Sequence, residues 1–146
     1  MKKIVLILIM FLCLSCSDND NDNDIIIIGT EFPQTWELVA MSGNVPNSTT
    51  TGDDMEWQEY YVLNNDQTFS KTRTREDVTT TESGTFEFFE QNSEDYLLLT
   101  YPTNNDIIGN CTAEFTEEFI LTDKDKMSST WRACDGPGLN YELKVD

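Results

Sequence analysis

From Thr35 onward, the chain alternates short apolar-rich runs with clusters of polar turn residues. The runs are rich in aromatic and β-branched residues, and they lack the 3.6-residue apolar period of an amphipathic helix. Clusters such as Asn64–Gln67 and Asp135–Gly138 have the composition of tight turns. The pattern predicts strands over residues 35–41, 56–63, 68–75, 78–89, 96–101, 112–122, 126–133 and 139–145.

These runs predict an all-β fold. Most connections between them are too short for parallel crossovers, which need roughly a dozen residues or more, so the strands should be antiparallel. An up-and-down meander of about eight strands closes into a small barrel, which removes exposed edges. A β-sandwich satisfies most of the same pattern and is the alternative. Gly84 is expected to mark a bulge or bend in the run 78–89.

The first residues have the pattern of an export signal. Two lysines precede an uninterrupted apolar run over residues 4–14, which is too short to span a bilayer as a helix of about 20 residues. The run ends in Cys-Leu-Ser-Cys, which resembles the bacterial lipobox, where a small residue precedes an acylated cysteine. The resemblance implies a lipoprotein signal peptide over residues 1–15 and a lipidated, palmitate-bearing Cys16. An ordinary secretory signal is the alternative.

A polar tether is expected over residues 16–29. Residues 18–24 alternate Asp with Asn and contain no apolar side chain, so they cannot form a core. The spacing does not fit a calcium-binding EF-hand loop, because Asn23 and Gly29 stand where Gly and Glu are required. Ile25–Ile28 is an isolated apolar run, and either an extra strand or a plug on the barrel would accommodate it.

An acidic stretch directly after a lipidated cysteine resembles the surface-export signal of some Gram-negative lipoproteins. The resemblance implies attachment to the outer membrane through the acyl chains, with the domain displayed on the cell surface. Retention in the periplasmic leaflet is the alternative. Acyl chains contribute about 0.8 kcal/mol per buried methylene, so two or more chains would anchor the protein firmly.

Charge and composition exclude several functions. The chain has 9 Lys and Arg against 27 Asp and Glu, with no His and a formal net charge of −18. Nucleic-acid binding needs clustered cations, so no nucleic-acid partner is expected. The absence of His removes Ser-His-Asp catalysis and the commonest metal ligand. We therefore expect no enzymatic activity, no cofactor and no metal site.

The cysteine count predicts one disulfide. Cys13 is expected to leave with the signal peptide and Cys16 to be acylated, which leaves Cys111 and Cys134 of the four cysteines. A remaining pair in an oxidising compartment usually forms a bridge. Two buried free thiols are the alternative.

Three short motifs resemble the lipocalin-like domains of bacterial lipoproteins. They are Thr-Trp-Glu-Leu-Val at 35–39, the strand-turn-strand of residues 61–69, and Ser-Gly-Thr-Phe at 83–86. The resemblance covers residues 30–146 and implies a small eight-stranded barrel with an axial pocket. It implies no particular ligand.

Basic residues alternate along the run 68–75. Lys71, Arg73 and Arg75 share one strand face with Phe69. This face is either an outward basic ribbon paired with acidic neighbours, or it brings cations to the barrel mouth to bind a carboxylate or another anionic group.

The predicted barrel is compatible with two functions. The first is a module that holds a small apolar or amphipathic ligand in the barrel. The alternative is a non-enzymatic surface interaction or structural protein with a solid core, which contacts proteins through the long connections 42–54 and 103–109. In that case the aromatic residues fill the core. The candidate ligand-binding residues are Trp36, Trp57, Tyr61, Phe69, Lys71, Arg73, Phe86, Phe88 and Trp131.

Overall fold

The computed structural model describes residues 31–112 and 114–144, and the predictions for the signal peptide, Cys16, the tether and Ile25–Ile28 lie outside these residues. Two short 3₁₀ turns, η1 and η2, accompany the strands. The elements are β1 (Gln34–Ser42), β2 (Thr50–Thr51), η1 (Gly52–Asp54), β3 (Gln58–Leu63), β4 (Thr68–Arg75), β5 (Val78–Gln91), β6 (Glu94–Thr100), β7 (Thr116–Asp123), β8 (Lys126–Ser129), η2 (Thr130–Cys134) and β9 (Gly138–Lys144).

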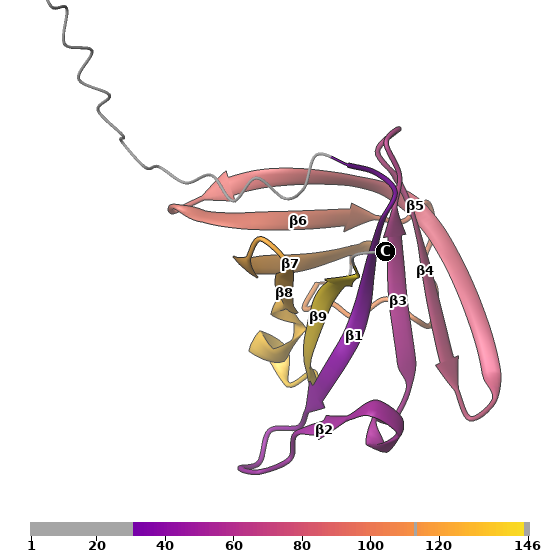
Figure 1. The fold of residues 1–146 in the computed structure, drawn as a ribbon, viewed down its shortest axis with the longest axis vertical. Coiled ribbons are helices and arrows are strands. Elements are labelled where there is room, and N and C mark those ends of the chain that lie inside the picture. The colour runs from indigo at the N-terminus through magenta and orange to yellow at the C-terminus, as the bar shows by residue number, and fades with distance from the viewer. Residues whose placement is uncertain (1–30, 113, 145–146) are drawn as a thin grey trace, which may run out of the picture.

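The strands form a closed antiparallel barrel (Figure 1). Each strand from β3 to β9 pairs with the next along the chain, and β1 closes the circle by pairing with both β3 and β9. The two-residue β2 adds to the end of β1. The prediction of an up-and-down barrel of eight strands is confirmed, and the β-sandwich alternative is not.

Tight turns set the register of the hairpins. Glu76 and Asp77 both have positive φ, as do Asn92 and Ser93. Two central residues with positive φ are the signature of type I′ turns, whose twist matches that of the flanking strands. These turns join β4 to β5 and β5 to β6 without a slip in register.

The long strand β5 serves two partners in succession. Its first part, Val78–Thr85, pairs with β4, and its second part, Thr85–Gln91, pairs with β6. Gly84 lies at this change of partner, where a Cβ atom would come within 2.1 Å of the Thr100 carbonyl oxygen. The absence of a side chain allows β6 to approach here, and β5 curves strongly in Figure 1, as expected for Gly84.

Two predicted strands differ from the structure by more than two residues at one end. The run 112–122 becomes a strand only from Thr116, because the Asn110 side chain donates to the Glu114 and Thr116 carbonyl oxygens and closes a loop instead. The run 126–133 ends as a strand at Ser129, whose hydroxyl accepts a hydrogen bond from the Trp131 backbone N–H and begins η2.

Aromatic and aliphatic side chains fill the barrel. In β1 the inward face carries Trp36 and Leu38, and then the register with β9 shifts so that Met41, rather than Ala40, is buried. The buried hydrophobic cluster also includes Met55, Trp57, Tyr61, Leu63, Phe69, Phe86, Leu97, Leu99, Tyr101, Phe119, Leu121, Met127, Leu139 and Tyr141.

Candidate functional site

The basic face of β4 points into the barrel. Side chains of a strand alternate between its two faces, and Phe69, Lys71 and Arg73 are all buried on the same side. Lys71 is 0% exposed and Arg73 is 8% exposed, so the expected outward ribbon is wrong for these two residues. Arg75 lies at the exposed end of the strand and pairs with Glu56.

Two buried glutamates compensate the two buried cations. Lys71 Nζ lies 2.7 Å from Glu117 Oε1 and 3.5 Å from Glu59 Oε1. Arg73 Nε lies 2.5 Å from Glu59 Oε2. Glu59 comes from β3 and Glu117 from β7, so the ion pairs join three strands across the interior. The four charges sum to zero, which is the condition under which buried charges are tolerated.

Three tyrosine hydroxyls complete this network. Tyr141 donates to Glu59 Oε1 at 2.6 Å, and Tyr101 and Tyr61 donate to Glu117 Oε2 at 2.5 and 3.0 Å. Burial and the neighbouring carboxylates raise the pKa of each of these phenols above its ordinary value. The three hydroxyls therefore remain neutral donors across the physiological pH range.

A loop between β6 and β7 supplies the remaining partners. The Ile107 carbonyl oxygen accepts a hydrogen bond from Lys71 Nζ at 2.6 Å, and the Gly109 N–H donates to Glu117 Oε1 at 2.7 Å. Each Glu117 oxygen thus accepts two hydrogen bonds, which is the full capacity of a carboxylate. Glu117 is therefore placed to hold structure and has no free lone pair for acid–base chemistry.

A disulfide and a tryptophan fix the same loop. Cys111 and Cys134 are bonded, with Cα atoms 5.5 Å apart, and the predicted disulfide is confirmed. Trp131 lies beside this bond, between two glycines. A Cβ atom would come within 2.4 Å of the Trp131 ring at Gly109 and within 2.5 Å at Gly136. The ring therefore requires a residue without a side chain next to it at both positions.

Arg73 also stacks on an aromatic ring. Its guanidinium lies 4.4 Å from the centre of the Trp57 ring, a cation–π distance. Arg73 Nη2 and Trp57 Nε1 are buried, and within the described ranges neither has a hydrogen-bond partner. Both groups are donors, so only an acceptor such as a water oxygen would satisfy them.

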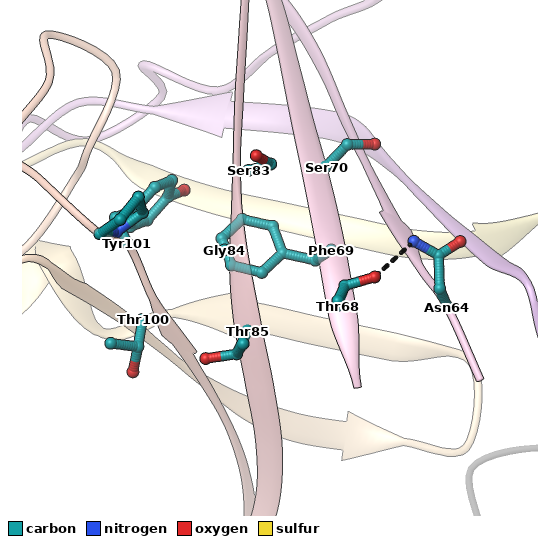
Figure 2. A pocket seen from close by; sticks show the side chains of 10 residues that line it. Asn64, Thr68, Phe69, Ser70, Ser83, Gly84, Thr85, Thr100 and Tyr101 are labelled. Carbon is teal, nitrogen blue, oxygen red and sulfur yellow. Dashed lines mark hydrogen bonds between the residues drawn. The ribbon is translucent and has the colours of Figure 1, made fainter. Parts of the chain in front are cut away.

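A surface hollow of about 550 Å³ lies beside the bend of β5. Figure 2 shows the side chains that line it. Its floor includes the rings of Phe69 and Tyr101, which meet edge to face at 5.0 Å. Phe69 and Tyr101 are 1% and 2% exposed, so these two rings themselves offer little surface to a ligand. The other lining residues are mostly hydroxyl-bearing or small: Asn64, Thr68, Ser70, Ser83, Gly84, Thr85, Thr100 and Pro102.

A second hollow, of about 340 Å³, is more aromatic. Phe32, Phe86 and Phe88 line it together with Asn64, Asn65, Gln67 and Glu87. The ring of Phe86 lies 6.0 Å from that of Phe32 and 5.5 Å from that of Phe88. Phe88 is 37% exposed, so this hollow presents apolar surface to solvent.

The residues predicted to bind a ligand divide among several places. Trp36, Tyr61 and Phe69 are buried in the core, and Lys71 and Arg73 belong to the ion-pair network. Trp57 and Phe86 also belong to the buried cluster, where Trp57 lies under Arg73 and Phe86 borders the aromatic hollow. Phe88 lines that hollow from a partly exposed position, and the Trp131 ring lies against Gly109 and Gly136.

Sequence reasoning missed the acidic half of the network. The available signal was the strand alternation, because Glu59 shares a face with Tyr61 and Leu63, and Glu117 shares one with Phe119 and Leu121. A charged residue on the apolar face of a predicted strand indicates either that the strand is wrongly assigned or that the charge has a buried partner of opposite sign. Here the partners are Lys71 and Arg73 of β4, which is next to β3 in the sheet and lies across the interior from β7.

No protein-family model, no curated protein and no solved structure matches this chain. In the part of the chain that the structure describes, no helix has the length and apolar character needed to cross a membrane. The same described ranges contain no group of three or more Cys, Asp or Glu residues arranged to hold a metal ion.

Proposed function

We propose that this chain is a lipid-anchored, non-enzymatic bacterial lipoprotein whose lipocalin-like barrel is a solid scaffold that presents its outer surface to a protein partner. The supporting observation is the interior network of Lys71, Arg73, Glu59 and Glu117. A ligand carrier needs a cavity with an apolar lining, whereas here charged groups and their donors occupy the middle of the barrel.

An apolar ligand would have to break this network in order to enter. Displacing Lys71 would leave Glu117 with a buried charge and no cation, and such a loss costs roughly 3–5 kcal/mol. The free energy gained from contact with the ligand would have to exceed that cost before the ligand could bind. Binding on the outside of the barrel has no such cost, and this favours the interaction function over the carrier function.

The proposed location rests on the first 24 residues. The basic start, the short apolar run and the cysteine at position 16 support acylation, and the acidic stretch behind it supports export to the surface of the outer membrane. The net charge of −18 makes a protein with a basic surface a more suitable partner than a nucleic acid.

Two measurements test this proposal. Labelled fatty acid should be incorporated into the wild-type chain and not into Cys16→Ser, and label that persists in the variant would contradict the anchor. Native mass spectrometry after gentle extraction from the source cells should show the chain with its acyl groups and no further small molecule. A stoichiometric apolar ligand that survives extraction would instead support the carrier function.

One observation supports a second candidate function. The aromatic hollow at Phe32, Phe86 and Phe88 has the size of the smaller known ligand sites and exposes part of the Phe88 ring. A small apolar or amphipathic molecule would bind there without disturbing the interior ion pairs. The hollow lies outside the charged network, so this function is compatible with a solid core.

A further inference from the structure

In the described part of the chain, the first half of β5 has a neighbouring strand on only one side. Residues 78–85 pair with β4, and β6 pairs only with residues 85–91. Among the described residues, no strand pairs with the other edge of residues 78–84. Figure 1 shows this half of β5 at the outer side of the β4–β5 hairpin. Such an edge offers unpaired backbone groups to a further strand.

One hydrogen bond shows which backbone groups face the free edge. The Phe86 N–H donates to the Gln67 carbonyl oxygen, on the β4 side, at 2.9 Å. Backbone groups of a strand point to alternate sides, so the N–H and C=O groups of Thr79, Thr81 and Ser83 point away from β4. All three residues are exposed. Three consecutive pairing positions are therefore open on this edge.

The outward side chains here are neutral and short. Thr81 and Thr79 lie within hydrogen-bond distance of Thr72 and Thr74 on β4, with hydroxyl oxygens 3.1 and 2.9 Å apart. Sheet edges are commonly protected by Lys or Pro. Neither residue type occurs within 78–84, although the chain as a whole is strongly charged.

We propose that this edge pairs with the same edge of a second copy of the chain, antiparallel, about a two-fold axis at Thr81. In this register Thr81 faces Thr81 of the second copy, and Thr79 faces its Ser83. Every open N–H and C=O group of the three residues then has a partner. Because the edge is its own complement, one surface forms both halves of the interface, as in most homodimers.

The register also suits the side chains on the other face. Glu82 faces Thr80 of the second copy, so the two Glu82 carboxylates are not opposed. Val78, which is 65% exposed, faces Gly84 of the second copy, and Gly84 borders the hollow of about 550 Å³. An exposed apolar side chain is thus placed beside a recess.

Other registers pair fewer groups. An axis at Ser83 would require the edge of Thr85, which is already paired with Thr100 on β6. An axis at Thr79 would require Asp77, which lies in the β4–β5 turn. Thr81 is the position that brings all three open residues into pairs.

Point substitutions at Thr81 can disrupt pairing at the open edge while leaving the barrel folded. The test is the mass of the full chain in mild detergent, measured by native mass spectrometry and sedimentation over a range of concentrations. Thr81→Lys would bring two cations together on the axis and should raise the dimer dissociation constant about tenfold or more. Thr81→Pro removes an N–H that faces the free edge and none that faces β4, so it should abolish the dimer and leave the barrel folded.

Thr72→Lys is the matched control. It adds the same charge on the same face and breaks the same Thr72–Thr81 hydroxyl contact, but on the neighbouring strand, away from the axis. The proposal expects a wild-type dimer that persists in Thr72→Lys. A wild-type chain that stays monomeric at its highest concentration overturns it, including a monomer whose edge pairs with the strand of another protein. A dimer that survives both Thr81 variants overturns it as well.

Discussion

Lys71 Nζ lies 2.7 Å from Glu117 Oε1, although the two residues are 46 positions apart in the sequence. β4 and β7 are not neighbours in the sheet, so this contact crosses the barrel interior. Glu59 on β3 joins the same cation at 3.5 Å. A single ammonium group thus connects three strands, and the barrel depends on it more than on any surface ion pair.

Lys71→Met should destabilise the fold strongly. The substitution leaves Glu117 buried without its cation, and breaking one partner of a buried pair costs roughly 3–5 kcal/mol. Urea unfolding followed by tryptophan fluorescence measures the change in free energy of unfolding. Adding Glu117→Gln removes the unpaired charge and should recover part of the loss, which keeps the test informative if Lys71→Met alone is poorly folded.

Lys126→Met is the control for this prediction. Lys126 pairs with Glu142 at 3.7 Å, and both side chains are about half exposed, so the loss should be at most about 1 kcal/mol. Equal losses in the two lysine variants would contradict the structural role assigned to the interior network.

Stability should fall as the pH rises above about 10. The pKa of Tyr61, Tyr101 and Tyr141 is raised in the folded state, so their contribution is fully present below the ordinary pKa of tyrosine. Above that pH the unfolded chain releases protons that the folded chain retains. Each phenol then removes about 1.4 kcal/mol of stability per pH unit until its folded pKa is reached.

Denaturant unfolding between pH 8 and 11 measures this slope. Tyr61→Phe should reduce the slope of the free energy of unfolding against pH by the contribution of one phenol. Tyr60→Phe, at an exposed position of the same strand, is the matched control. An unchanged slope in Tyr61→Phe would mean that this hydroxyl titrates in the folded protein as it does in the unfolded chain.

Gly109→Ala and Gly136→Ala should each destabilise the protein. Their new Cβ atoms would meet the Trp131 ring at 2.4 and 2.5 Å, and overpacking of this kind costs about 1–3 kcal/mol. Gly43→Ala is the matched control, since a Cβ atom at Gly43 would lie 3.5 Å from its nearest contact, Ser48 Oγ, which is an ordinary van der Waals distance. Thermal unfolding followed by tryptophan fluorescence measures the loss of stability in each variant. A loss in Gly43→Ala as large as in the other two would contradict the ring contact as the cause.

Phe88→Ser should weaken binding of an apolar probe at the aromatic hollow. Phe88 is partly exposed and lines that hollow, so its removal takes away contact surface with little cost to the fold. Fluorescence titration with a fatty-acid probe measures the affinity. Phe115→Ser, which removes an exposed ring outside the lining set, is the control. Equal affinity of the probe for both variants and the wild type would show that the probe does not bind in this hollow.

The strand pattern could be predicted because most turns have strong local signals. The strand expected at 68–75 has these bounds in the structure, between a polar turn and the Glu76–Asp77 turn. The bridge between Cys111 and Cys134 followed from the cysteine count once Cys13 and Cys16 were assigned to the export signal and to acylation. The strand expected from Thr112 begins only at Thr116, because Thr and Phe favour strands locally while the Asn110 side chain holds the chain before Thr116 in a loop.

The interior network could not be predicted in full because it depends on pairing across the barrel. The alternation of Lys71 and Arg73 with Phe69 was visible, but sequence alone left open whether that face points inward. A charged face usually points to solvent, and only the positions of Glu59 and Glu117 make burial favourable. The resemblance to lipocalin-like domains implied an axial pocket, whereas ion pairs lie in the interior of the barrel.

The position of β1 determines how the barrel responds to a mechanical load. The described chain enters the barrel through Gln34, and from there β1 is hydrogen-bonded to β3 on one side and to β9 on the other. A pull applied at the N-terminal side acts along this strand, perpendicular to both rows of hydrogen bonds. The bonds then share the force in shear rather than opening one after another like a zipper. A barrel tethered at this end therefore resists being dragged open by its own attachment.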